Sequence, residues 1–122
     1  MKIPAFLLRR LYVRGSLRTT DEGFEFQLRN RLGSGYARRL KPLMLDGTEL
    51  DMALTTFEVE GKRASFDAVS QTTPFTLAMN KTTTIAFAGG RLVGGRHKIG
   101  MRFEVAGLGE LGFDFSDVAA DA

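Results

Sequence analysis

The stretch Ile99–Ser116, IGMRFEVAGLGELGFDFS, decides the fold that this sequence predicts. In its first half every second residue is apolar as far as Val105, and the same alternation runs from Leu111 to Phe115. A period of two places successive side chains on opposite faces of a strand. The residues Gly107–Glu110 between the halves include two glycines, which suit a turn. We therefore predict a β-hairpin with one buried and one exposed face.

Shorter pieces of the same pattern precede this hairpin. Phe24–Asn30 alternates between apolar and polar residues. In Leu11–Leu17 the apolar side chains share one parity, which predicts another strand. The residues Thr19–Gly23 between this strand and Phe24–Asn30 have a length typical of a hairpin loop. Thr82–Ala88 is a further predicted strand. These runs indicate an antiparallel arrangement that extends along the chain.

Two dipeptides, Asp46-Gly47 and Glu60-Gly61, lie between apolar residues and predict two more hairpins. With them the chain contains about eight short strands at near-regular spacing. A sustained helical period is absent, and Phe6–Leu11 and Asp67–Ser70 could each form one helical turn. We predict an all-β fold, an antiparallel β-sandwich that forms a single domain over residues 1–122. Within it we expect an arm at residues 1–10 and a frayed tail at residues 118–122.

The chain has 122 residues, no cysteine and one histidine. The length supports one domain with a core of its own. Without cysteine there is no disulfide, thiolate nucleophile or Cys-based metal site, and one histidine excludes a multi-histidine site. We predict no catalytic, cofactor-binding or metal-ligating residues. The run Ile3–Leu8 lacks the features of a signal peptide, and no stretch reaches the roughly 20 apolar residues of a membrane span, so we expect a cytoplasmic protein.

Charge is unevenly distributed along the chain. Residues 1–41 hold ten Lys and Arg against three Asp and Glu, a net charge of +7, and residues 42–122 hold seven against eleven, a net charge of −4. Either basic strands near the start pack beside acidic strands near the end, or the basic start contacts an anionic partner. With few exposed aromatic residues expected, a protein interface is favoured over nucleic acid. The candidate interface residues are Arg9, Arg10, Tyr12, Arg14, Arg18, Arg38 and Arg39.

His97 is the one side chain suited to act as a general base near neutral pH without a perturbed pKa. It follows Gly94-Gly95 and shares the parity of Ile99, so we expect it on the buried face, hydrogen-bonded to the preceding turn. Its cationic neighbours Arg96 and Lys98 predict a lowered pKa. A functional role for His97 stays open as a weaker alternative.

Two carboxylate pairs and a glycine-rich run are further candidates for chemistry. Glu58 and Glu60 share a solvent-facing parity, and Asp114 and Asp117 lie in the last predicted strand. Spacing alone selects neither pair for glycosidase-type catalysis. Gly89–Gly95 precedes a strand, whereas a phosphate-binding glycine loop precedes a helix, so we interpret these glycines as turn residues.

The order of motifs between Phe24 and Val105 resembles a known family. After the early strand come Gly35-Tyr36, Leu45-Asp46-Gly47 and Phe57–Lys62, and the series ends on Gly89–Ile99, which reads G-G-x-L-x-x-G-x-H-x-I. This order resembles the small β-subunit of the C-glycoside deglycosidases. Most of the matching positions are turn residues, which report a fold more than an activity. The basic start and the last hairpin depart from the family's pattern.

The resemblance implies a non-catalytic β-sandwich subunit that pairs with a larger, sugar isomerase-like TIM-barrel subunit in carbohydrate metabolism. That partner would carry the divalent metal and the acid/base groups of a C-deglycosylating complex, so no cofactor is expected in this chain. A homo-oligomer is the other partnership that we expect, with no membrane and no nucleic acid. Short chains of this kind are also loosely associated with the name hydroxymethylglutaryl-CoA reductase. The sequence contains no nucleotide-binding βαβ unit or catalytic cluster that supports that activity.

Two other functions remain as alternatives. One is a stand-alone β-sandwich module that binds carbohydrate or protein. The other is a small enzyme that uses His97 with a carboxylate.

Overall fold

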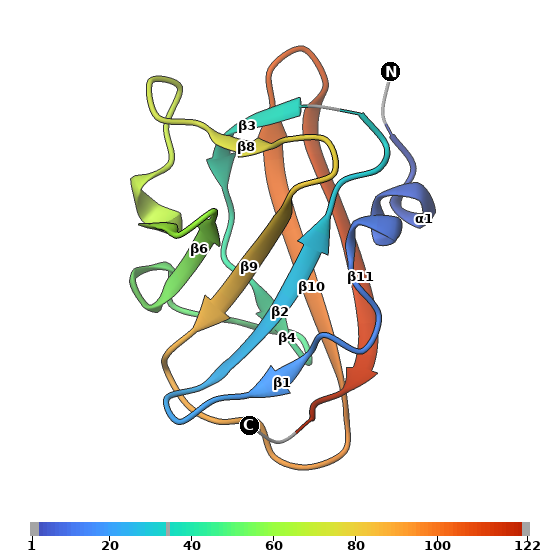
Figure 1. The fold of residues 1–122 in the computed structure, drawn as a ribbon, viewed down its shortest axis with the longest axis vertical. Helices are drawn as coiled ribbons and strands as arrows, with labels where there is room; N and C mark the ends of the chain where they lie inside the picture. Colours follow the sequence, from blue (N-terminus) through green and yellow to red (C-terminus); the bar gives the residue numbers. More distant parts are fainter. Residues whose placement is uncertain (1–2, 34, 121–122) are drawn as a thin grey trace.

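The computed structural model describes residues 3–33 and 35–120, and this part of the chain forms a two-layer antiparallel β-sandwich (Figure 1). The predicted all-β class is confirmed. Sheet I contains, in spatial order, β1 (Arg18–Thr19), β2 (Phe24–Arg29), β9 (Thr82–Phe87), β6 (Thr55–Val59) and β7 (Lys62–Ser65). Sheet II contains β5 (Thr48–Glu49), β4 (Met44–Leu45), β10 (Arg96–Val105), β3 (Gly35–Leu40) and β8 (Phe75–Leu77), with β11 (Gly109–Val118) on the other side of β10.

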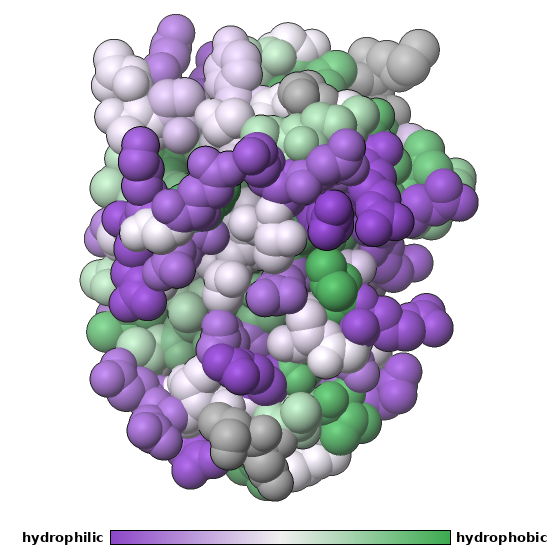
Figure 2. Space-filling view, viewed as in Figure 1, coloured by the Kyte–Doolittle hydropathy of each residue, from purple (hydrophilic) through white to green (hydrophobic). Residues whose placement is uncertain are grey.

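Figure 1 shows β2 and β9 of sheet I crossing in front of β10 and β11 of sheet II. Four short helical turns complete the described elements: α1 (Ala5–Leu8) and the 3₁₀ turns η1 (Arg9–Leu11), η2 (Met52–Leu54) and η3 (Phe66–Ala68). None of the helices in these residues has the length and apolar character needed to cross a membrane. Hydrophilic side chains cover much of the face seen in Figure 2, with hydrophobic patches between them.

The hairpin predicted from Ile99–Ser116 is confirmed, and it forms the longest strand pairing within the described residues. β10 and β11 pair from Arg96↔Val118 to Val105↔Gly109. The residues of inward parity are buried in the core between the sheets: Ile99, Met101, Phe103, Leu111, Phe113 and Phe115. The outward parity carries glycines and charged residues, so the alternation read from the sequence is the alternation between core and surface.

Two tight turns have the backbone that their sequences predict. Asp46 and Gly47 have φ angles of 50° and 89°, and Glu60 and Gly61 have φ angles of 52° and 82°. Positive φ at both central residues is the requirement of a type I′ hairpin turn. The first turn joins β4 to β5 and the second joins β6 to β7, which confirms both predicted hairpins.

The strand predicted over Leu11–Leu17 is wrong. η1 ends at Leu11, and Gly15 has a φ angle of 84°, which interrupts an extended chain. Leu11 and Leu17 are both buried, although a turn rather than a strand directs them inward. Equal parity therefore reported burial here without reporting the backbone conformation.

α1 and η1 pack along β11 (Figure 1). Leu8, within the segment expected as an arm, is buried in the core. At the other end of the chain the Ala120 N–H donates to the Leu17 carbonyl, and the Ala120 carbonyl accepts from the Thr19 N–H. Residues 121–122 of the expected tail lie outside the described residues.

The sequence did not predict β3 or β8. Along β3 the buried residues are Ala37 and Leu40, three positions apart. The register against β10 shifts between Glu104 and Val105, and such an irregularity breaks the period of two that sequence analysis relies on. The described residues form eleven strands, several of them only two residues long, against about eight expected.

Candidate functional site

Four of the seven candidate interface residues lie together beside β11. They line a surface groove, which we call the arginine groove, together with residues 114–117 of β11. The other charged and aromatic residues that line it are Phe6, Arg9, Arg10, Tyr12, Arg14 and Arg96. α1 and η1 supply the first three of these side chains, and the turn after η1 supplies the next two. Arg96 comes from the start of β10.

Arg9 ties the N-terminal helical turns to the edge of β11. Its Nε donates to the Asp114 carbonyl at 2.6 Å, and its Nη2 lies 3.5 Å from the Asp114 carboxylate. The Nζ of Lys98 lies 3.8 Å from the same carboxylate. Arg9 therefore satisfies a backbone acceptor at the edge of β11, and the charge of Asp114 is shared between two cations.

Tyr12 and Asp117 form the fixed floor of the groove. The Tyr12 ring stacks on Phe115 with centroids 3.6 Å apart, and its hydroxyl donates to Asp117 Oδ2 at 2.7 Å. Burial, followed by the bond to Asp117, raises the pKa of Tyr12 to about 12. The Tyr12 hydroxyl lowers the pKa of Asp117, with help from the Gly15 and Val118 N–H groups. Both side chains are thus committed to structural bonds.

Arg10, Arg14 and Arg96 differ from Arg9. All three are exposed, and within the described residues no carboxylate oxygen lies within 4.0 Å of their guanidinium nitrogens. Arg96 makes one long contact, from Nη2 to the Ser116 carbonyl at 3.5 Å. The groove therefore presents three guanidinium groups whose charge is not neutralised by ion pairs in the described chain.

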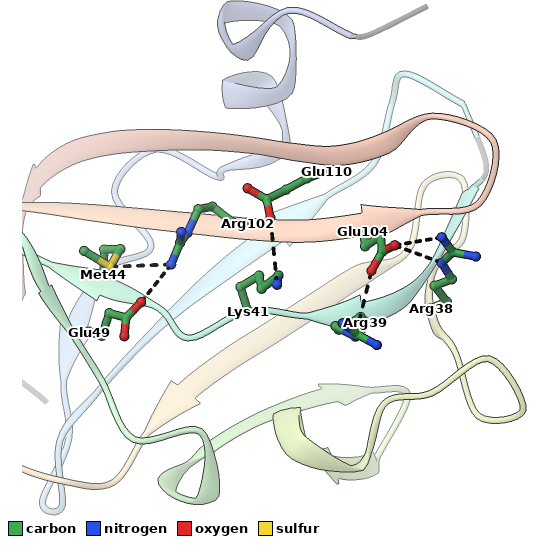
Figure 3. A network of polar contacts seen from close by, with 8 residues as sticks. All are labelled: Arg38, Arg39, Lys41, Met44, Glu49, Arg102, Glu104 and Glu110. Carbon is green, nitrogen blue, oxygen red and sulfur yellow. Dashed lines mark hydrogen bonds and ion pairs between the residues drawn. The ribbon is translucent and has the colours of Figure 1, made fainter.

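Arg38 and Arg39 lie elsewhere, on the outer surface of sheet II, which we call the ion-paired face (Figure 3). Arg38 Nη2 lies 2.7 Å from Glu104 Oε1, and Arg39 Nε lies 3.8 Å from Glu104 Oε2. Lys41 approaches Glu110 at 4.0 Å. The Arg38 hydrogen bond lowers the pKa of Glu104. Here basic residues near the start of the chain pack beside acidic residues near its end, which is the first of the two interpretations of the charge asymmetry.

Arg102 lies on the ion-paired face between Glu49 and Glu110 (Figure 3). Together with Gly100 and Gly112 it lines a surface hollow. Its Nη2 donates to Glu49 Oε2 at 3.1 Å and contacts the Met44 sulfur at 3.8 Å. Its Nε is buried and has no hydrogen-bond partner among the described residues. A buried donor without an acceptor is unusual and calls for an explanation.

The remaining charged candidates form local pairs. Arg18 Nη2 lies 2.8 Å from Glu25 Oε1, and this pair joins β1 to β2 in sheet I, whereas the ion-paired face belongs to sheet II. Glu58 pairs with Arg63 at 3.2 Å, and the ammonium group of Lys81 lowers the pKa of Glu60. In the described residues no group of three or more histidine, aspartate or glutamate side chains could hold a metal ion.

His97 bridges two loops. Its Nδ1 lies 2.6 Å from Asp46 Oδ2 and its Nε2 lies 2.5 Å from the Val93 carbonyl, which confirms the expected bond to the preceding turn. The Asp46 bond and the Val93 carbonyl raise the pKa of His97, and the Lys98 N–H and His97 lower the pKa of Asp46. The predicted lowering by Arg96 and Lys98 has the wrong sign, because two acceptors contact the ring directly.

Sequence reasoning missed Phe6 and Arg96 as groove residues. Phe6 and Arg10 are four positions apart and so share one helical face, a signal that was available in the sequence. Arg96 had the outward parity of Lys98, but its position beside Arg10 and Arg14 follows only from the packing of α1 and η1 against β11.

Fold and surface together define a small antiparallel β-sandwich domain with one ion-paired face and one arginine groove. Comparison with family models identifies it further. Residues 7–120 match the family described as hydroxymethylglutaryl-CoA reductase, N-terminal domain, and the chain belongs to this family. The comparison with curated proteins gave no match.

The family match corrects the resemblance drawn from the turn motifs. The chain is not a member of the C-glycoside deglycosidase β-subunit family, and the predicted role beside a sugar isomerase-like subunit in carbohydrate metabolism is wrong. Neither alternative, a stand-alone binding module or an enzyme based on His97, gains support from the match. The turn residues misled because many β-sandwiches need glycine at tight turns whatever their function.

Proposed function

We propose that this domain is an accessory part of a hydroxymethylglutaryl-CoA reductase system and associates with a catalytic module through the ion-paired face. The observation that carries the proposal is the family match, which covers residues 7–120 and so includes every described strand. The family is described as an N-terminal domain, and such a domain works beside the rest of its protein.

The ion-paired face has the properties of a docking surface. Arginine is enriched in protein interfaces, and this face presents Arg38, Arg39 and Arg102 on one side of sheet II. The unsatisfied Nε of Arg102 costs about 1–3 kcal/mol while it remains buried. An acceptor-bearing partner in the adjacent hollow would remove that cost if the Arg102 side chain moves on docking and exposes its Nε to the partner's oxygen.

A substitution that fills the hollow tests the proposal. A Cβ on Gly100 would lie 3.4 Å from the Met44 Cβ, an ordinary contact, so Gly100→Gln should fold and project a side chain over the face. We expect this variant to weaken association with the catalytic portion of a hydroxymethylglutaryl-CoA reductase by about tenfold or more, which corresponds to about 1.4 kcal/mol. Titration calorimetry measures the affinity, and the rate of hydroxymethylglutaryl-CoA reduction is followed in the same mixtures.

Thr84→Gln is the matched control, because Thr84 lies on the outer surface of sheet I and receives the same side chain. The control should bind the catalytic portion as the wild-type domain does. Absence of a wild-type complex at micromolar concentration, or an equal loss in both variants, would overturn the proposed function.

A further inference from the structure

We propose that the arginine groove is a binding site for a phosphorylated nucleotide, with the phosphates on Arg10, Arg14 and Arg96 and the base on Phe6. The groove adjoins the ion-paired face at Asp114, but its proposed ligand-binding residues are not the residues Arg38, Arg39 and Arg102 on which the proposed function rests. The inference therefore does not depend on the proposed function.

The charge of the groove points to a ligand with more than one negative charge. Four arginines and two aspartates line it. Asp114 is engaged by Arg9 and Lys98, and Asp117 accepts bonds from Tyr12, Gly15 and Val118. Arg10, Arg14 and Arg96 make no ion pair within 4.0 Å among the described residues, although the charge of Arg96 helps to stabilise the Asp117 carboxylate. Guanidinium groups bind phosphate oxygens through paired, charge-assisted hydrogen bonds.

The groove is held in shape without a ligand. Arg9 fixes η1 to the β11 backbone, and the Tyr12 ring is stacked on Phe115. Two buried leucines, Leu8 and Leu11, anchor the helical turns that carry Phe6 and Arg10. A ligand would therefore have to order arginine side chains but not the backbone beneath them, which limits the entropic cost of binding.

Phe6 distinguishes a nucleotide from a simple anion. Its side chain is 63% exposed at the edge of the groove, whereas the ring of Tyr12 is covered by Phe115. An exposed aromatic ring offers a stacking surface for a planar base. Single-stranded nucleic acid requires a series of such platforms, and within the groove Phe6 is the one aromatic side chain that is exposed. One nucleotide fits this arrangement better than a strand.

Titration calorimetry at about 0.15 M ionic strength, where charges more than about 8 Å apart are largely screened, tests the proposal with ADP, inorganic pyrophosphate and adenosine. We expect ADP to bind more tightly than pyrophosphate, which lacks the base, and than adenosine, which lacks the phosphates. Phe6→Ala should remove the advantage of ADP over pyrophosphate. Coenzyme A in place of ADP distinguishes the two sources of this chemistry, a free nucleotide and the nucleotide portion of a thioester carrier; preference for either supports the site.

The triple variant Arg10→Gln, Arg14→Gln, Arg96→Gln should weaken ADP binding by about tenfold or more, because it removes the charge-assisted bonds. The control is Arg29→Gln, Arg31→Gln, Lys62→Gln, which changes the net charge equally on residues outside the groove. It should weaken binding by less than about twofold in screened solution. Equal losses in both triple variants, no binding of ADP, or tighter binding of a short single-stranded oligonucleotide would overturn the proposal. Thermal unfolding of each variant identifies any loss that comes from misfolding.

Discussion

His97, at the start of β10, connects the turn that contains Asp46 with the loop that contains Val93, and its contact with Asp46 spans 51 positions of the sequence. Both ring nitrogens face acceptors, Asp46 Oδ2 and the Val93 carbonyl, so the doubly protonated ring satisfies both bonds. The Asp46 backbone N–H and its Oδ1 bond in turn to Lys98 in β10. A neutral imidazole has one N–H and must give up one of these bonds. The protonation state of His97 therefore decides whether both of its hydrogen bonds can form.

The stability that His97 contributes should therefore fall as the pH rises from its ordinary pKa of 6.5 through its raised folded pKa. The folded pKa of His97 is raised above its ordinary value of 6.5, so its contribution is complete below that pH and is lost as the pH rises through the folded value. Asp46 acts oppositely: its pKa is lowered below 3.8, and its contribution is lost only as the pH falls through the folded value. The bridge is strongest between these limits.

Urea unfolding from pH 5.5 to 9 measures this effect. His97→Gln should lower the free energy of unfolding by about 1–2 kcal/mol at pH 6, because one side-chain amide cannot replace both bonds. The difference between variant and wild type should shrink as the pH rises. A difference that stays constant over the whole range would show that the proton on His97 contributes nothing.

At the scale of the element, the β10–β11 hairpin determines which substitutions the ion-paired face accepts. The side chain of Arg102 lies against Gly112, its cross-strand partner. A Cβ added at Gly112 would lie 3.0 Å from Arg102 Cγ and 3.2 Å from the Met101 carbonyl oxygen. The same addition at Gly100 meets only ordinary contacts. The two glycines share one face of one hairpin but differ in what surrounds them.

Gly112→Val should destabilise the domain by about 1–3 kcal/mol, the usual cost of forcing atoms into an occupied space. Gly100→Ala should change the free energy of unfolding by less than about 0.5 kcal/mol. Urea midpoints of the two variants measured under one buffer condition check both values. Equal effects at the two positions would contradict the packing described around Arg102.

At the scale of the whole molecule, the N-terminal helical turns belong to the core. Leu8 and Leu11 are each 3% exposed, whereas Phe6, between them and the start of the chain, is 63% exposed. Residues 5–11 pack against β11, with Leu8 and Leu11 in the core, and their Phe6, Arg9 and Arg10 side chains line the arginine groove. The stability of the sandwich and the shape of the arginine groove therefore depend on the same short segment.

Substituting one buried and one exposed residue of this segment by alanine separates its contribution to stability from its contribution to the groove. Leu8→Ala should lower the free energy of unfolding by about 2–5 kcal/mol, because it leaves a cavity in the core. Phe6→Ala should lower it by less than about 0.5 kcal/mol. Thermal or urea unfolding measures both. A Leu8→Ala domain as stable as the wild type would show that residues 5–11 are an arm and not part of the core.

The candidate site was only partly predictable from sequence. Arg9, Arg10, Tyr12 and Arg14 line one groove, as their closeness in the chain predicts, and their role as interface residues stays a prediction. Arg38 and Arg39 were grouped with them by charge alone, and the structure pairs both with Glu104. Composition reports the amount of charge, and cross-strand register decides which charges meet their opposites.

The sequence by itself determined the all-β class, the β10–β11 hairpin and the two type I′ turns. These features depend on the period of two and on residues that accept positive φ, which are local properties of the chain. Only the tertiary structure decided that β3 carries an irregular register, that Arg102 has a buried unpaired Nε and that Arg96 completes the arginine groove. Each of these depends on segments distant in sequence being packed together, and the pattern within one segment does not specify its neighbours.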